Sequence, residues 1–200
     1  MNHKISKIVI ATHNAGKIKE FQYLLKPYKI KCYPISNFSN LIPKETGKSF
    51  KQNAIIKAIN ASKISGLPSL ADDSGLVIPL LKNKPGIYSA RWAKNAGNYY
   101  SAMYLIKAKL ENMQLPNKKV PAYFICNLTY ATTEGILMNY EGKINGKLQF
   151  PPIGNSGFGY DPIFIPDGEL KTLAQMSNEK KQSLSHRREA FEKFKLDKLI

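Results

Sequence analysis

Cysteine is scarce in this 200-residue chain, and long apolar runs are absent. The two cysteines, Cys32 and Cys126, lie far apart in apolar segments, so we interpret them as reduced core thiols and not as a disulfide or a metal pair. No stretch approaches the roughly 18 apolar residues of a membrane span, and the N-terminal segment has no apolar signal-peptide core. We therefore expect a soluble, cytoplasmic protein with no membrane partner.

Acidic residues are few, since 14 Asp and Glu stand against 30 Lys and Arg and the formal net charge is +16. Arginine is also rare, being confined to Arg91, Arg187 and Arg188, while the lysines are spread along the whole chain. Binding of single-stranded nucleic acid usually combines a basic groove with interleaved aromatic residues. We therefore prefer a solvated lysine surface and expect no stable nucleic-acid partner. A basic field would also attract a small polyanionic substrate.

The order of the apolar patterns predicts a mixed α/β protein. Runs rich in branched apolar residues predict strands at 7–12, 30–35, 69–78 and 120–132. Helical spacing predicts helices at 17–28, from 50 to near Gly66, from about 98 to 113, and from about 178 onward. The pair Asn145–Gly146 predicts a hairpin turn. No linker or repeat interrupts the chain, so we expect a single domain at 1–200.

The segment ADDSGL, which begins at Ala71, places two carboxylates side by side between apolar runs. We expect Asp72 and Asp73 where a strand ends or bends, and two adjacent anions near a core need a positive partner. Glu45 adds a third carboxylate that can join them around one ion. Oxygen ligands of this kind suit Mg²⁺. The predicted partner of Asp72 and Asp73 is therefore a metal ion carried by a nucleotide.

The segment THNAGK connects the first predicted strand to the first predicted helix. Its backbone N–H groups and the helix N-terminus can hold phosphates, and Lys17 adds a cation. An ordinary strand–helix turn with an exposed lysine explains the segment equally well. The nearby TGKS, which begins at Thr46, is not a P-loop, because Ile42 occupies the position of the required glycine and no strand precedes it.

Two later segments suit recognition of a base. In GFGYDP, two glycines flank Phe158, so the backbone can approach a ligand while the ring offers a stacking face. A tight turn with a core phenylalanine is the alternative. The segment KKQSLSHRR gathers cations and a histidine near the start of the last helix, although a solvated basic face would look the same. Together the segments predict binding of a nucleoside triphosphate with its magnesium.

Six segments, in this order, resemble the signature blocks of the inosine triphosphate pyrophosphatase family: IVIATHNAGKIKEF, ETGKSFKQNAIIKA, LPSLADDSGLVI, GIYSARWA, GNSGFGYDPIF and LSHRREAF. The resemblance covers nearly the whole chain. It implies a mixed central β-sheet flanked by helices in a bilobed molecule with the active site in the cleft. It also implies a homodimeric, Mg²⁺-dependent hydrolase that converts ITP, dITP, XTP and dXTP to the monophosphate and pyrophosphate, which keeps deaminated purines out of DNA and RNA.

The resemblance further implies roles for single residues. Asp73 matches the proton acceptor and metal ligand, with Glu45 and Asp72 beside it, and the sequence does not divide the roles of base and orienter between the two aspartates. The implied triphosphate-binding turn comprises Thr12, His13, Asn14, Ala15, Gly16 and Lys17, and Ser74 is a further implied substrate contact. The implied base pocket comprises Phe158, Gly159, Tyr160, Asp161, Lys181, His186 and Arg187.

Two rival functions stay open on the sequence. A non-catalytic nucleic-acid-binding protein would account for the charge but would give the three carboxylates no role. A related pyrophosphatase acting on modified pyrimidine or ordinary deoxynucleoside triphosphates would share the metal centre and differ in the base pocket.

Overall fold

The computed structural model describes residues 5–113 and 120–199 of the chain. The chain divides into two compact units. Unit 1 takes in Met1–Asp73, Cys126–Gly142 and Arg187–Ile200, and unit 2 takes in Ser74–Ile125 and Lys143–His186. The single domain at 1–200 and the bilobed shape with a cleft stay predictions. Among the described residues, no helix is long and apolar enough to span a bilayer.

The described strands form one mixed sheet in the order β2-β1-β3-β5-β6-β7, with β4 paired to β3. The strands are β1 (Lys7–Ile10), β2 (Lys31–Pro34), β3 (Ser69–Ile78), β4 (Lys84–Pro85), β5 (Pro121–Ala131), β6 (Leu137–Leu148) and β7 (Phe164–Pro166). The helices are α1 (Ala15–Leu25), α2 (Phe50–Ser65), α3 (Ser89–Asn95), α4 (Tyr99–Glu111), α5 (Asn178–Leu184) and α6 (His186–Lys198). β1 runs parallel to β2 and β3, whereas β4 and β7 are antiparallel to their partners. The predicted mixed α/β class is confirmed.

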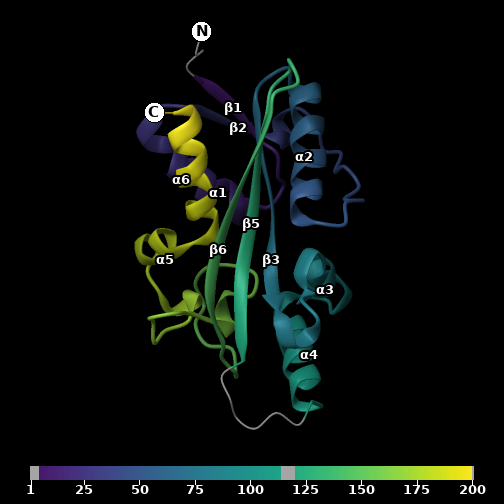
Figure 1. Ribbon diagram of the computed structural model, residues 1–200, viewed down its shortest axis with the longest axis vertical. Helices are drawn as coiled ribbons and strands as arrows, with labels where there is room; N and C mark the ends of the chain where they lie inside the picture. The colour runs from purple at the N-terminus through teal and green to yellow at the C-terminus, as the bar shows by residue number, and fades with distance from the viewer. Residues whose placement is uncertain (1–4, 114–119, 200) are drawn as a thin grey trace. The chain divides into compact units, whose positions relative to one another are not determined.

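In unit 1, helices cover both faces of the strands. Ile8 and Ile10 of β1 pack in one core cluster with Phe21 of α1 and Phe191 of α6. Val9, the residue between the two isoleucines, packs in another cluster with alanines of α2. Figure 1 shows α1 and α6 on one side of these strands and α2 on the other. Successive strand residues point to opposite faces, so neighbours in β1 enter different clusters.

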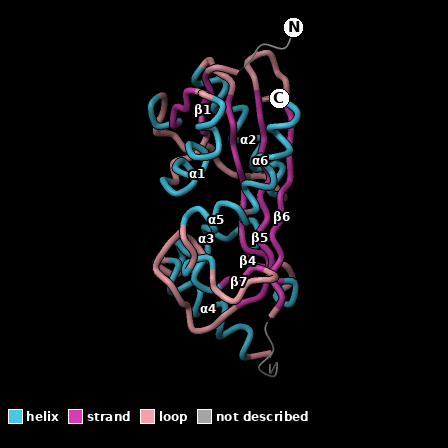
Figure 2. The backbone as a smooth tube through the Cα atoms, turned by 90° about the vertical axis from the view of Figure 1, so that its left-hand side faces the viewer, coloured by secondary structure: helices cyan, strands magenta, loops and turns pink. Residues whose placement is uncertain are grey.

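Unit 2 has a core of its own. Leu76 of β3, Phe124 of β5, Phe164 of β7 and Ile106 of α4 are buried in one cluster. The rings of Phe124 and Phe164 meet edge to face, with centroids 4.7 Å apart. Helices α3 and α4 lie next to each other in this unit (Figures 1 and 2).

Most predicted elements are present with small shifts at their ends, and β3 matches the predicted strand at 69–78. Two helical predictions need correction. Residues 89–95, which lie outside the helices predicted from the sequence, form α3. The last helix is divided into α5 and α6, because Ser185 between them has an extended backbone (φ −75°, ψ 143°).

The hairpin predicted at Asn145–Gly146 is wrong. β6 runs without interruption through both residues, and Gly146 pairs with Pro166 of β7. A Cβ atom at Gly146 would lie 2.3 Å from the carbonyl oxygen of Ile165. The glycine therefore permits the close approach of two strands, which is a common use of glycine within a sheet.

Candidate active site

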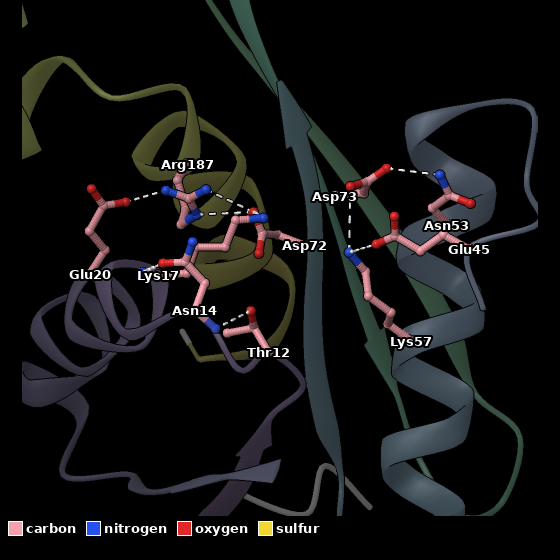
Figure 3. Close-up of polar contacts among 10 residues, drawn as sticks. All are labelled: Thr12, Asn14, Lys17, Glu20, Glu45, Asn53, Lys57, Asp72, Asp73 and Arg187. Carbon is pink, nitrogen blue, oxygen red and sulfur yellow. Dashed lines mark hydrogen bonds and ion pairs between the residues drawn. The ribbon is translucent and has the colours of Figure 1, made fainter. Parts of the chain in front are cut away.

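Asp72 and Asp73 are consecutive residues of β3 whose side chains lie on opposite faces of the strand (Figure 3). The residues before them follow the same alternation, since Leu70 packs in the cluster of α1 and α6 and Ala71 in the cluster of α2. β3 continues past both aspartates to Ile78, so the strand does not end at them. Because the strand is regular, its alternation of side chains separates the two carboxylates.

Asp72 is the centre of a buried ion-pair network. Its Oδ2 atom accepts hydrogen bonds from Nη2 and Nε of Arg187 at 2.8 and 3.2 Å, and lies 2.9 Å from Nζ of Lys17. The other end of the Arg187 guanidinium donates from Nη1 to Oε2 of Glu20 in α1. Asp72 and Arg187 are each 1% exposed. The positive partners of Asp72 in this structure are therefore protein cations.

Burial by itself would raise the pKa of the Asp72 carboxyl. The Arg187 guanidinium and the Lys17 ammonium more than offset burial and hold the pKa of Asp72 well below its ordinary value. The same network raises the pKa of Arg187, because Asp72 and Glu20 outweigh its desolvation. Asp72 is thus an anion whose main contacts are structural, and removing one partner from such a buried pair usually costs about 3–5 kcal/mol.

The predicted phosphate turn forms a strand–turn–helix connection. Asn14 caps α1 by accepting a hydrogen bond from the backbone N–H of Lys17 at 3.1 Å, and its own N–H donates to Oγ1 of Thr12 at 3.2 Å. His13 Nε2 lies 3.4 Å from the carbonyl oxygen of Ser39. Ala15 and Gly16 are the first two residues of α1, ahead of the first intrahelical hydrogen bond, which Ile18 donates to Asn14 at 3.0 Å. The first turn of an exposed helix offers N–H groups to an anion.

Asp73 faces α2 and meets two of its side chains (Figure 3). Asn53 donates from Nδ2 to Oδ2 of Asp73 at 3.1 Å, and Nζ of Lys57 lies 3.4 Å from Oδ1 of Asp73. The same Lys57 ammonium is 2.8 Å from Oε1 of Glu45. Asn53 and Lys57 are one helical turn apart, so they present their polar ends to the same patch of β3. Glu45 and Asp73 consequently share one cation.

The loop that carries Glu45 is held against the start of α2. The N–H of Gly47 donates to Oδ1 of Asn53 at 2.9 Å, which fixes the amide so that its Nδ2 faces Asp73. A Cβ at Gly47 would lie 2.6 Å from that Oδ1 atom, so the contact requires glycine. Ser49 caps the helix by accepting from the N–H of Gln52 at 3.2 Å. The loop and the helix thus position Glu45 and Asp73 together.

The pKa values of Asp73 and Lys57 are both raised, but for different reasons. Burial raises the pKa of Asp73, and the nearby Lys57 ammonium lowers it only in part. Burial alone would lower the pKa of Lys57, but Asp73, Asp72 and Glu45 together raise it. Asp73 is therefore a carboxylate that gains a proton more readily than an ordinary aspartate, as a general base should.

The chemistry of the pair fits a divalent cation bound with a substrate. Mg²⁺ is usually held by one or two carboxylates together with substrate phosphates and water, and Glu45 and Asp73 already meet at one cation, the Lys57 ammonium. In the part of the chain that the structure describes, no group of three His, Cys, Asp or Glu side chains is placed to hold a metal. The three-carboxylate cluster predicted from the sequence does not form, because Asp72 points to the other face of β3.

Unit 2 holds a second polar group around Phe158. Asp161 accepts a hydrogen bond from the N–H of Phe158 at 2.8 Å and lies 2.8 Å from Nζ of Lys181. That ammonium is 4.5 Å from the centre of the Phe158 ring. Gly157, at φ +80°, would bring a Cβ within 2.2 Å of the Asp161 carboxylate. The backbone, the ring and the ion pair are therefore locked into one arrangement.

The other residues predicted to contact the substrate lie in different environments. Tyr160 is 2% exposed and donates its hydroxyl hydrogen to the carbonyl oxygen of Ser89 at 3.0 Å, so it belongs to the core of unit 2. Gly159 has a positive φ of 69°, and Ser74 is half-buried in β3. The ring of His186 stacks on that of Phe124, with centroids 5.1 Å apart.

Arg187 does not match its predicted use as a hydrogen-bond donor to the base. Its guanidinium is 1% exposed and donates to Asp72 and Glu20 in unit 1. A base-reading arginine needs an accessible guanidinium face or edge. The motif around Arg187 is visible in the sequence, but the carboxylates that bind this side chain cannot be identified from it.

A sequence model of the Ham1 family matches residues 8–196. The chain is 42% identical over 203 residues to a protein of Bradyrhizobium diazoefficiens named dITP/XTP pyrophosphatase, and the alignment covers 96% of both chains. A protein of the same name from Gluconobacter oxydans is 40% identical, with 94% of this chain and 89% of that one covered. The chain belongs to the Ham1 family.

Solved structures of Ham1 proteins share the fold. The Ham1 protein of Staphylococcus aureus aligns with a TM-score of 0.82 at 34% identity, over 96% of this chain and 97% of that one. A HAM1 protein of Coxiella burnetii aligns with a TM-score of 0.86 at 35% identity, over 96% and 98%. The family resemblance predicted from the sequence blocks is confirmed.

Sequence reasoning missed three residues that this Ham1 chain places at the carboxylates: Asn53 and Lys57 opposite Asp73, and Glu20 behind Arg187. A signal was available for two of them. Asn53 and Lys57 stand at helical spacing with the buried alanines of α2, on a face where an amphipathic helix usually carries apolar residues. A polar side chain on the buried face of a helix needs a polar partner.

Proposed function

We propose that this Ham1 protein is a metal-dependent pyrophosphatase that hydrolyses deaminated purine nucleoside triphosphates, ITP and dITP and XTP and dXTP, to the monophosphate and pyrophosphate. The observation that carries the proposal is the Glu45–Asp73 pair around one cation. It is supported by relatives 42% and 40% identical that are named dITP/XTP pyrophosphatase.

Asp73 is the proposed general base. A water molecule attacks the α-phosphorus, the bond from that phosphorus to the bridging oxygen of the β-phosphate breaks, and pyrophosphate leaves. Asp73 takes the proton of the attacking water, for which its raised pKa suits it. Asn53 holds the carboxylate in place from α2. A divalent cation bound by Glu45 and Asp73 would neutralise phosphate oxygens and stabilise the leaving pyrophosphate.

The phosphates are proposed to bind at the turn before α1. The exposed first turn of that helix supplies N–H groups and a partial positive charge. Lys17 supplies a full charge, and Asp72 anchors its ammonium at 2.9 Å. Asp72 is in turn fixed by Arg187. The proposed role of Asp72 is therefore to position Lys17, while Asp73 does the proton chemistry.

Base recognition is proposed for the Phe158 group in unit 2. The ring gives a stacking face that every base can use. Hypoxanthine and xanthine carry an acceptor oxygen at C6 where adenine carries a donor amino group, so the Lys181 ammonium beside the ring favours the former. A site built on hydrogen bonds can reject a mismatched group by roughly ten-thousandfold.

Mg²⁺ as the metal, a homodimer and a cytoplasmic location complete the proposal. The two-carboxylate donor set supports Mg²⁺. The homodimer rests on the family resemblance, and the location rests on the two cysteines interpreted as reduced core thiols.

The experiment is a panel of ITP, XTP, dITP, ATP, GTP and dUTP with Mg²⁺, read by pyrophosphate release. The expected result is that ITP, dITP and XTP are turned over far faster than ATP and GTP, and that EDTA abolishes activity and added Mg²⁺ restores it. Equal turnover of ATP or dUTP would contradict the assignment to deaminated purines. Nucleic-acid binding without pyrophosphate release would favour the non-catalytic rival.

A further inference from the structure

Lys57 occupies the position that the proposed metal site would need. Its ammonium lies 2.8 Å from Oε1 of Glu45 and 3.4 Å from Oδ1 of Asp73. The side chains of Lys57 and Asp73 are 13% and 9% exposed, and that of Glu45 is 29% exposed. The two carboxylates and the ammonium together carry a net charge of −1 at a site that is largely shielded from water.

A divalent cation and this ammonium would compete for the same two carboxylates, since both are attracted by the same negative charge. Mg²⁺ binds carboxylate oxygens at about 2.0–2.1 Å, so a metal held by Glu45 and Asp73 would need the carboxylates that Nζ of Lys57 now contacts at 2.8 and 3.4 Å. Two cations at such a distance repel strongly where little water screens them. One of the two must leave before the other enters.

We propose that Lys57 is the exchangeable counter-cation of the Glu45–Asp73 pair. In the nucleotide-free protein, its ammonium holds the two carboxylates together and keeps free divalent cations out. It withdraws when the metal arrives with a polyanionic nucleotide. This inference rests on the proposed function, because it concerns the same carboxylates.

The structure supports such an exchange in two ways. Lysine carries its charge on a flexible four-carbon stem, so the ammonium can move without moving the helix. Asn53, one turn earlier in α2, keeps its hydrogen bond to the other oxygen of Asp73 and is itself fixed by Gly47. Asp73 therefore keeps its orientation when Lys57 leaves.

Charge balance explains why the nucleotide matters. Replacing the ammonium by a divalent cation changes the charge at the two carboxylates from −1 to 0, and the displaced ammonium, which stays close by, brings the local total to +1. The negative charge of the triphosphate compensates both. Free metal brings no such anion, so the wild-type protein should bind it weakly in the absence of nucleotide.

The test measures Mn²⁺ binding to the nucleotide-free protein, by calorimetry and by the electron paramagnetic resonance signal of free Mn²⁺. The variants are Lys57→Met, Lys57→Arg and, as a matched control, Lys63→Met, which removes an exposed lysine from the same helix. Lys57→Met should bind Mn²⁺ at least about tenfold more tightly than wild type, or about 1.4 kcal/mol. Lys57→Arg and Lys63→Met should bind it as weakly as wild type.

Two results would overturn the proposal: unchanged or weaker Mn²⁺ binding by Lys57→Met, or binding by Lys57→Arg as tight as by Lys57→Met, which would make space and not charge the cause. If Lys57→Met does not fold, the test is made on the wild-type protein instead. Reductive methylation read by peptide mass spectrometry should modify Lys57 faster in saturating Mn²⁺, relative to Lys63, and an unchanged ratio contradicts the exchange. Neither measurement uses nucleotide hydrolysis, so failure of the exchange and failure of the proposed function are separate outcomes.

Discussion

Asp72 and Asp73 are adjacent in sequence, yet Asp72 is held by Arg187 on one face of β3 and Asp73 by Asn53 and Lys57 on the other. The pKa of the first carboxyl is lowered and that of the second is raised. The two neighbouring aspartates therefore have different roles. Substitutions at the two positions should separate stability from catalysis.

Asp73→Asn should abolish most turnover and leave the fold intact. The amide keeps an acceptor oxygen for Asn53 but cannot take a proton, and a general base contributes at least about a hundredfold to the rate. The thermal midpoint should stay the same or rise, because a neutral side chain suits this buried position. Pyrophosphate release and a melting curve test both parts. Retention of more than about a tenth of wild-type activity would place the base elsewhere.

Asp72→Asn should instead reduce stability, by about 3–5 kcal/mol, because the buried Arg187 charge would lose the carboxylate that accepts from Nε and Nη2 and keep Glu20 at Nη1. Arg187→Met should cost a similar amount. The double variant should cost less than the sum of the two, since contacting residues are not additive. Urea unfolding of all three proteins measures this coupling. A stable Arg187→Met that has lost only its preference for ITP over ATP would restore the predicted role of Arg187 in base recognition.

Stability should also depend on Asp72 in acid. Its folded pKa lies below the ordinary value of 3.8, so its contribution is complete above that pH and is lost as the pH falls through the folded value. The stability difference between wild type and Asp72→Asn should therefore narrow as the pH is lowered below 3.8. Melting temperatures measured across this range check the sign. A difference that grows in acid would contradict it.

The acid limb of kcat/KM should report Asp73. The base acts when ionised, so activity falls as the pH drops through its pKa, and that pKa is raised. The nearby Lys57 ammonium lowers the pKa of Asp73, so Lys57→Met should move the limb to higher pH. Lys63→Met, on the same helix, should leave it in place. A limb that does not move in Lys57→Met would show that another group controls it.

Gly157 offers a test of the Phe158 group. Gly157→Ala would press a Cβ to within 2.2 Å of the Asp161 carboxylate, which holds Lys181 and the Phe158 backbone. Gly168 has the same φ of +80°, and no described atom lies within 4 Å of a Cβ added there, so Gly168→Ala carries the backbone strain alone. Both should lose some stability, and Gly157→Ala alone should raise KM for ITP. Phe158→Ala should weaken all purine nucleotides alike, because stacking is not selective.

Local patterns are enough for most of the elements and for the family. The buried strand at 69–78, the capped turn before α1 and the cap and length of α2 depend on residues close together in sequence, where periodicity and capping chemistry apply directly. The ordered motif blocks likewise lead to the Ham1 family. The prediction at Asn145–Gly146 is wrong because the sequence does not distinguish a glycine that forms a turn from one that allows two strands to pack closely.

What each carboxylate meets was decided by the tertiary structure. Arg187 reaches Asp72 across 115 residues of sequence, and Lys57 joins Glu45 and Asp73, which lie on different segments. Such pairs depend on which helices cover which face of the sheet, and no local pattern encodes that choice. The sequence by itself determined that Asp72 and Asp73 are buried anions in need of positive charge. Packing of α1 and α6 on one face, and of α2 on the other, decided which cations meet them, because a β-strand turns successive side chains to opposite sides.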